Sequence, residues 1–236
     1  VWKVSNYWRE PPSEIDRPPS VSVKKILIVL SDTGGGHKAS ASALSAALNE
    51  LRPEGVEIKI VDVLEDYTLW FSNRLYNWWV TMPEIWGTIY HTTKQVHDLP
   101  WPLDTRKSLE LTYLEGFTRC IQEEAPDIIV SVHPILQASP RACQQVKHGR
   151  HIPFVTVVTD LADAHPWWFN PAADRIVVPT DDARAQAISR GIDPARLAVC
   201  GLPLRKGFWH VDASPDRRAE VRRALGLRVD GPVVLL

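Results

Sequence analysis

Short apolar runs alternate along this chain with longer segments of helix-forming residues. The continuous apolar run Ile26–Leu30 is typical of a strand that is buried on both faces of a parallel sheet. Similar patterns predict strands at 56–63, 127–132, 154–161, 175–179, 197–200 and 231–236, and helices at 38–51, 105–124, 181–190 and 212–225. A chain of 236 residues can hold one large α/β domain with a substantial core.

A glycine triplet follows the first predicted strand. Gly34, Gly35 and Gly36 let the backbone turn sharply and expose its N–H groups, and a helix N-terminus after such a loop binds diphosphates and other anions. The positive end of that helix disfavours an imidazolium ion, so we expect His37 to be neutral and able to accept a proton. Alone, the triplet fits a plain tight turn with a capping histidine equally well, because it is neither G-x-G-x-x-G nor a P-loop.

Polar residues also follow two later strands. His133 comes directly after the third predicted strand, so we expect it near His37 at the switch point of a doubly wound sheet, although a structural hydrogen bond is the alternative role. Asp160 ends the fourth predicted strand and could orient a histidine or a sugar hydroxyl, or only cap a loop. Together with Asp163 and His165 these side chains lack the paired spacing of a zinc site, so we expect no metal.

Tryptophan is over-represented between residues 67 and 103. The chain has ten tryptophans, and this segment includes Trp70, Trp78, Trp79 and Trp86. Its apolar content exceeds what one helix face needs for packing, and an indole suits an interface that is apolar on one side and wet on the other. Membrane contact and ordinary core packing are equally good interpretations.

Charge and composition narrow the classes of partner. The formal net charge is −1, so no basic field favours nucleic acid. No apolar run approaches the roughly 20 residues that span a bilayer.

Residues 1–23 are rich in proline and predict an extended lead-in. Because the first residue is Val and no signal or transit pattern is visible, we expect the sequence to start inside a longer chain.

Several strings resemble one family. Ser31–Ala41 (SDTGGGHKASA) is similar to the signature of monogalactosyldiacylglycerol synthases, where Arg usually occupies the Lys38 position. Four later strings are similar to the same family: PDIIVSVHP from Pro126, VTDL ending at Leu161, HxxWF from His165, and GLPLR ending at Arg205. Processive diacylglycerol glucosyltransferases and the enzyme that adds N-acetylglucosamine to form lipid II belong to the broader group.

The resemblance implies a Rossmann-like doubly wound parallel sheet, the N-terminal half of a GT-B glycosyltransferase. It divides the chain into the lead-in at 1–23, an acceptor domain at 24–205, and a hinge with the start of a nucleotide-sugar domain at 206–236. Most of the nucleotide-sugar site would then lie beyond residue 236, and we expect this fragment alone to be inactive.

The resemblance also implies a reaction, the transfer of galactose from UDP-galactose to diacylglycerol with inversion. His37 would be the catalytic base, the loop of Thr33, Gly34, Gly35 and Gly36 would face the diphosphate and acceptor, and His133 and Asp160 are secondary candidates. The lipid acceptor would contact the side chains of Trp78, Trp79, His165 and Trp168.

No cofactor is implied, and the expected partners are diacylglycerol, UDP-galactose and an anionic membrane surface, without nucleic acid. We expect a peripheral membrane protein, at the plastid (chloroplast) envelope in a eukaryote or at the cytoplasmic membrane face in a bacterium. Two alternatives remain open: a UDP-glucose-dependent enzyme that uses diacylglycerol or a polyprenyl-diphosphate sugar, and a non-catalytic lipid-binding module.

Overall fold

A computed structural model describes residues 23–32, 35–68, 78, 82–96, 105–138, 151–161 and 163–234. Four residues expected in the site or at the lipid surface lie outside these ranges, together with nearly all of the lead-in: Thr33, Gly34, Trp70 and Trp79. The helices are α1 (Gly35–Leu51), α2 (Val63–Tyr67), α4 (Pro83–Val96), α5 (Thr105–Glu124), α7 (Asp181–Ser189), α8 (Lys206–Trp209) and α9 (Pro215–Ala224), with short 3₁₀ helices η2 (Pro134–Ala138), η3 (Pro166–Trp168) and η4 (Pro194–Arg196).

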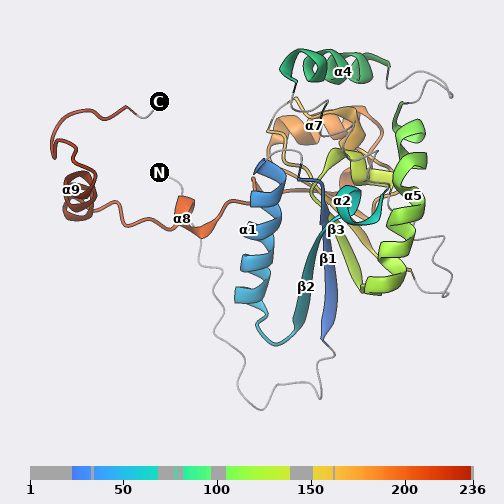
Figure 1. The fold of residues 1–236 in the computed structure, drawn as a ribbon, viewed down its shortest axis with the longest axis horizontal. Coiled ribbons are helices and arrows are strands. Elements are labelled where there is room, and N and C mark those ends of the chain that lie inside the picture. The colour runs from blue at the N-terminus through green and yellow to red at the C-terminus, as the bar shows by residue number, and fades with distance from the viewer. Residues whose placement is uncertain are drawn as a thin grey trace.

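Six parallel strands form one sheet in the order β2-β1-β3-β4-β5-β6 (Figure 1). They are β1 (Lys24–Leu30), β2 (Val56–Asp62), β3 (Ile128–Ser131), β4 (Phe154–Val157), β5 (Arg175–Val178) and β6 (Leu197–Val199). In the register of β1, Ile28 lies opposite Ile60 of β2 and Val130 of β3. The chain reverses its direction across the sheet after β2, so the switch point lies between β1 and β3.

Both faces of the sheet are covered, as the continuous apolar runs predict. Leu27 and Val29 of β1 belong to a large core cluster that includes residues of α2, α5 and α7. Ile28 and Leu30 point to the other face and pack in a second cluster with Ala41 of α1. Helices α1 and α5 therefore lie on opposite sides of the sheet (Figure 1). The predicted Rossmann-like, doubly wound α/β fold is confirmed.

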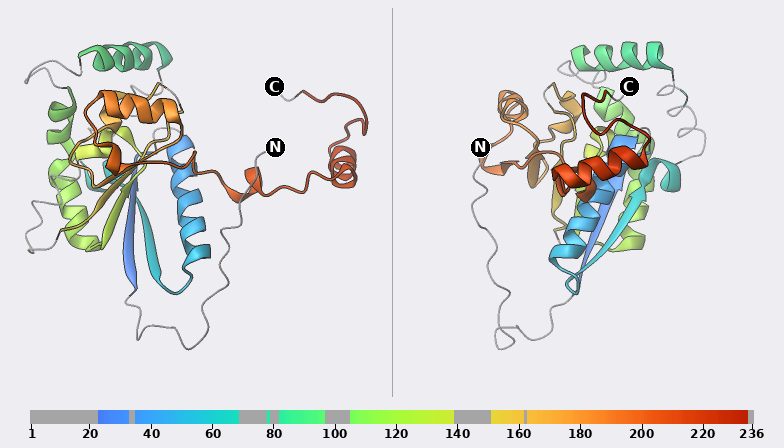
Figure 2. Two further views of the ribbon diagram at one scale, coloured as in Figure 1. Left: turned by 180° about the vertical axis from the view of Figure 1, so that it is seen from behind. Right: turned by 90° about the vertical axis from the view of Figure 1, so that its left-hand side faces the viewer.

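Two predicted strands are wrong in extent. The strand predicted at 154–161 ends at Val157. The backbone N–H of Val158 still donates to the Val177 carbonyl, but the chain then turns away from β5 towards the site. Residues 231–234 form no strand. A strand needs a neighbouring strand with which to form hydrogen bonds. Residues 231–234 come after α8 and α9, which extend away from the sheet as an arm (Figure 2).

The arm consists of α8, α9 and the segments around them. Neither helix has a buried residue. Near the sheet, Lys206 forms an ion pair with Glu50 of α1 at 2.8 Å.

Helix α4 lies over the carboxyl edge of the sheet (Figure 1). In the described part of the helix no side chain is fully buried, and the residues of its outer face are polar. Across the ranges that the structure describes, no helix is long and apolar enough to cross a membrane.

Candidate active site

His37 lies on the first turn of α1, directly after the glycine loop at the end of β1. Its Nδ1 is 2.8 Å from the carbonyl oxygen of Val132, which follows β3. A carbonyl only accepts hydrogen bonds, so Nδ1 carries the proton and donates. Nε2 is therefore the nitrogen that can accept a proton when the ring is neutral.

The surroundings of His37 favour that neutral ring. Burial lowers its pKa below the usual histidine value, while the bond to Val132 and the negative charge of Asp160 act in the opposite direction. Desolvation is the largest cause of the lowered pKa. The positive end of α1, inferred from the sequence, acts in the same direction.

His133 lies directly beside His37, with 4.4 Å between the ring centroids and an edge-to-face angle of 61°. Its Nδ1 accepts a hydrogen bond from the backbone N–H of Ile135 at 3.3 Å. The side chain is buried, and burial together with the neighbouring His37 holds the pKa of His133 well below the usual value. A neutral His133 adds no positive charge against which His37 would have to be protonated.

Asp160 lies in the loop that follows β4 and lines the same pocket as His37. Its Oδ2 accepts hydrogen bonds from the indole N–H of Trp168 at 2.8 Å and from the backbone N–H of His165 at 3.2 Å. The Trp168 ring centroid lies 6.1 Å from that of His37. The structure thus brings together His37, His133, Asp160 and Trp168, which come from three different strand ends.

Trp168 and His165 differ from the expectation that they face a lipid groove. Trp168 is 0% exposed and His165 is 3% exposed. Both face inward because Asp160 and the η3 turn give their polar atoms partners inside the protein. Both side chains therefore pack inside the protein next to the site. Trp78, by contrast, is 50% exposed to solvent.

A pocket of about 460 Å³ opens beside His37. Its walls come from the start of α1, from Thr159 and Asp160, and from the segment that leads into α8. The lining includes the backbone of Gly36, the apolar side chains of Leu202, Pro203 and Leu204, and a cation, Arg205, that stacks over the Phe208 ring at 5.3 Å. One pocket thus combines a helix N-terminus and a positive side chain with an apolar wall.

The sequence analysis missed two supporting residues, Thr159 and Gln137. Thr159 places its hydroxyl 3.2 Å from Nδ1 of His37. Gln137, fully buried beneath the site, donates to the Ser131 hydroxyl at 3.0 Å and to the His133 carbonyl at 2.9 Å, and its Oε1 accepts from Thr156. Gln137 belongs to no local motif, and Thr159 lies in the string VTDL, where only the aspartate was assigned a role. They lie six and two residues beyond the ends of β3 and β4.

Asp62, at the end of β2, is a structural cap. Its side chain accepts from the backbone N–H groups of Leu64 and Glu65 at the start of α2, and from Asp32 at 2.6 Å. These bonds leave it tied to backbone and not aimed at a ligand. Within the described ranges no group of three His, Cys, Asp or Glu side chains is placed to hold a metal ion.

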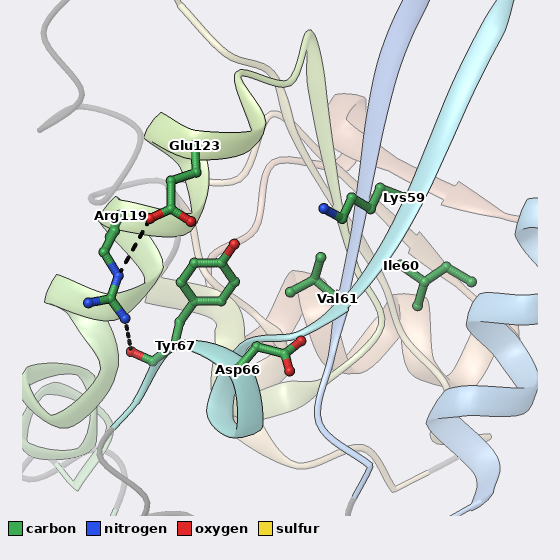
Figure 3. A pocket seen from close by; sticks show the side chains of 7 residues that line it. All are labelled: Lys59, Ile60, Val61, Asp66, Tyr67, Arg119 and Glu123. Atoms are coloured by element: carbon green, nitrogen blue, oxygen red, sulfur yellow. Dashed lines mark hydrogen bonds and ion pairs between the residues drawn. The ribbon is translucent and has the colours of Figure 1, made fainter.

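A second pocket, of about 470 Å³, lies between β2, α2 and α5 (Figure 3). Its two cations are already engaged: Lys59 with Glu124 at 2.5 Å, and Arg119 with Glu123 at 3.9 Å. Arg119 also stacks over the Tyr67 ring at 5.6 Å. This pocket shares no lining residue with the one beside His37.

Fold and site together define a Rossmann-like α/β domain with a histidine of lowered pKa at its switch point, beside an open pocket. A model described as "Monogalactosyldiacylglycerol (MGDG) synthase" matches residues 37–204, and the chain belongs to that family.

Curated relatives agree with the family model. The probable monogalactosyldiacylglycerol synthase of Nicotiana tabacum, named chloroplastic, is 36% identical over 220 residues, which is 90% of this chain and 39% of the relative. Monogalactosyldiacylglycerol synthase 1 of Arabidopsis thaliana, also named chloroplastic, is 36% identical over 230 residues, 94% of this chain and 40% of the relative. The chain therefore spans about two fifths of the length of these relatives.

Among solved structures, S. aureus MnaA in complex with UDP is 16% identical with a TM-score of 0.47, over 84% of this chain and 50% of that one. A match at this level places no residue of the site.

Proposed function

We propose that the protein transfers galactose from UDP-galactose to diacylglycerol with inversion, and that this chain supplies the acceptor domain and the catalytic base. One observation carries the proposal. His37 is held neutral, with Nδ1 anchored on Val132, at a helix N-terminus beside an open pocket, in a chain that belongs to the synthase family.

In the proposed reaction, Nε2 of His37 takes the proton of the free hydroxyl of diacylglycerol. The hydroxyl oxygen forms a bond to the anomeric carbon of galactose from the face opposite the diphosphate. The bond from that carbon to the phosphate oxygen breaks, and UDP leaves with the electron pair. The charge of Asp160 stabilises the imidazolium ion that forms on His37, because opposite charges favour the charged state.

The pocket suits the two substrates in different ways. The start of α1 and the guanidinium of Arg205 line the side on which negative charge can be stabilised. Leu202, Pro203 and Leu204 supply apolar wall for the acceptor. Residues 206–236 are proposed to be the hinge and the start of the nucleotide-sugar domain, which would supply most of the donor contacts.

Donor choice is tested with the full-length protein and diacylglycerol vesicles. UDP-galactose and UDP-glucose are compared at equal concentration, and the lipid product is isolated and its anomeric configuration measured by NMR. We expect a β-galactolipid, formed with a higher kcat/KM than any glucolipid. Equal or faster transfer of glucose would refute the proposed donor, and an α-linked product would refute inversion.

We also propose peripheral attachment to an anionic membrane surface, at the plastid envelope in a plastid-bearing organism. The names of the chloroplastic relatives support the compartment, and the half-exposed ring of Trp78 supports the surface. Insertion of the exposed part of this ring, about 100 Å², into the headgroup boundary would stabilise membrane binding by about 2 kcal/mol, roughly 30-fold in partitioning.

Vesicle co-sedimentation of the Trp78→Ala variant tests the attachment. Trp209, 62% exposed on α8, provides a matched Trp209→Ala control. We expect weaker binding only for the position 78 variant, and little change with salt. Equal binding of wild type and Trp78→Ala, abolished in both by salt, would mean that charge holds the membrane.

A further inference from the structure

Helix α4 is fastened to the site by polar contacts from a single turn. Lys94 forms an ion pair with Asp163 at 2.5 Å, and the Tyr90 hydroxyl donates to the Asp163 carbonyl at 3.4 Å. Oγ1 of Thr93 lies 3.2 Å from Nε2 of His165, whose ring centroid is 5.0 Å from that of Tyr90. All of these contacts reach the short segment 163–165.

The described side chains of α4 contribute little apolar packing to the core. None of the α4 side chains whose burial the structure describes is fully buried, and the two hydrophobic clusters include no described residue of α4. By contrast, α1 and α5 each place side chains in a cluster. Among the contacts that the structure describes, those to residues 163–165 are therefore the ones that hold α4 over the carboxyl edge of the sheet.

His165 uses its two ring nitrogens for two different tasks. Nδ1 accepts from the backbone N–H of Trp167 at 3.2 Å and caps the η3 turn. An accepting Nδ1 places the proton of a neutral ring on Nε2, which donates to Thr93. The Thr93 hydroxyl can accept this bond because its own proton goes to the Ile89 carbonyl at 2.7 Å.

The backbone of His165 adds a third task. Its N–H donates to the Asp160 carboxylate, which also accepts from Trp168 at the end of η3. The η3 turn that His165 caps therefore carries one donor to Asp160, and His165 itself carries the other. Asp160 in turn lines the pocket with His37.

We propose that His165 is a positioning residue with two separable effects: Nε2 fixes α4 over the approach to the site, and Nδ1, through η3, holds Asp160 beside His37. The inference rests on the proposed function, because the first effect should act on acceptor binding and the second on the chemical step. Donor binding should be affected by neither.

Three variants of the full-length protein separate these effects. Thr93→Val removes the acceptor on α4 and keeps the shape of the side chain. His165→Asn keeps an oxygen that can cap η3, since Asn is among the best N-cap residues, but it is too short to reach Thr93. His165→Ala removes both bonds. Thr88→Val is the matched control, because Thr88 lies on the same helix and bonds only to the Glu84 carbonyl at 2.9 Å among its described contacts.

Loss of one hydrogen bond should change a local equilibrium by about two- to tenfold. We expect Thr93→Val and His165→Asn each to raise the KM for diacylglycerol by about that factor, with kcat and the donor KM unchanged. The double variant should be no worse than His165→Asn alone, because the bond to Thr93 is already lost in that variant. His165→Ala should lower kcat as well, and the Asn variant should restore kcat but not KM. Thr88→Val should match wild type.

Hydrogen exchange of the peptide at 83–96 provides a readout that does not depend on activity. Exchange should rise about two- to tenfold in Thr93→Val and His165→Asn and stay unchanged in Thr88→Val. The inference is overturned if Thr93→Val behaves like Thr88→Val in both assays, or if His165→Asn lowers kcat as much as His165→Ala. If the protein transfers no sugar to lipid, the proposed function fails, while the exchange data still test the attachment of α4.

Discussion

Alanine at position 116 would force two helices apart. Gly116 lies in α5 where it crosses the end of α2, and an added Cβ would stand 1.9 Å from the carbonyl oxygen of Tyr67 and 2.8 Å from its carbonyl carbon. Both contacts are with backbone, so no side chain can rotate away. Overpacking of this kind costs about 1–3 kcal/mol or more, and the better helix propensity of alanine offsets about 1 kcal/mol.

We therefore expect Gly116→Ala to lower the free energy of unfolding by about 2 kcal/mol, or Tm by about 4–8 °C for a domain of this size. Gly87→Ala is the control. Position 87 also lies in a helix, but nothing is within 4 Å of its added Cβ, so stability should rise by up to about 1 kcal/mol. Urea unfolding of both variants gives the comparison. A Gly116→Ala protein as stable as wild type would refute the close approach of α2 and α5.

Three further predictions concern the site. Asp160→Asn should lower the His37 pKa further, because a favourable negative charge is lost, and should move the acid limb of the kcat/KM profile to lower pH; an unmoved limb would contradict the role of Asp160. Gln137→Leu should cost about 2–4 kcal/mol in urea unfolding, since Ser131 and Thr156 lose a buried partner; a loss below about 1 kcal/mol would contradict the network. The pKa values of His37 and His133 are lowered in the fold, so the unfolded chain binds more protons below about pH 6.5. The free energy of unfolding should therefore fall on acidification, by up to about 1.4 kcal/mol per pH unit for each histidine. His37→Gln should show a shallower dependence of this free energy on pH, and an unchanged dependence would argue against a lowered pKa for His37.

The sequence predicted the fold and the meeting of His37 with His133 because both depend on local signals. A buried strand followed by a glycine loop and a helix specifies where a strand end lies, and parallel strands bring their carboxyl ends to one edge. His133 needed only the further inference that its strand neighbours β1, which the pairing of Ile26 with Ile128 shows.

Orientation of the aromatic side chains could not be predicted in the same way. The tryptophan at 168 suited a lipid groove, yet its indole N–H points to Asp160 and its ring is buried. The sequence does not reveal which polar atom will satisfy an indole, since that depends on the turn that η3 makes after His165. The roles of Gln137 and Thr159 were missed for a related reason: each reaches its partner across the sheet or between strand ends, and no spacing along the chain predicts that contact.

The central claim, that His37 is the catalytic base, is tested most directly by the turnover of the full-length protein. His37→Gln puts an amide in place of the imidazole, and an amide cannot serve as a base near neutral pH. His151→Ala removes an exposed histidine that contacts Asp174, away from the site. With UDP-galactose and diacylglycerol both saturating, we expect kcat to fall by about 10²- to 10⁴-fold in His37→Gln and to stay unchanged in His151→Ala. A folded His37→Gln protein whose kcat stays within about twofold of wild type would contradict the account.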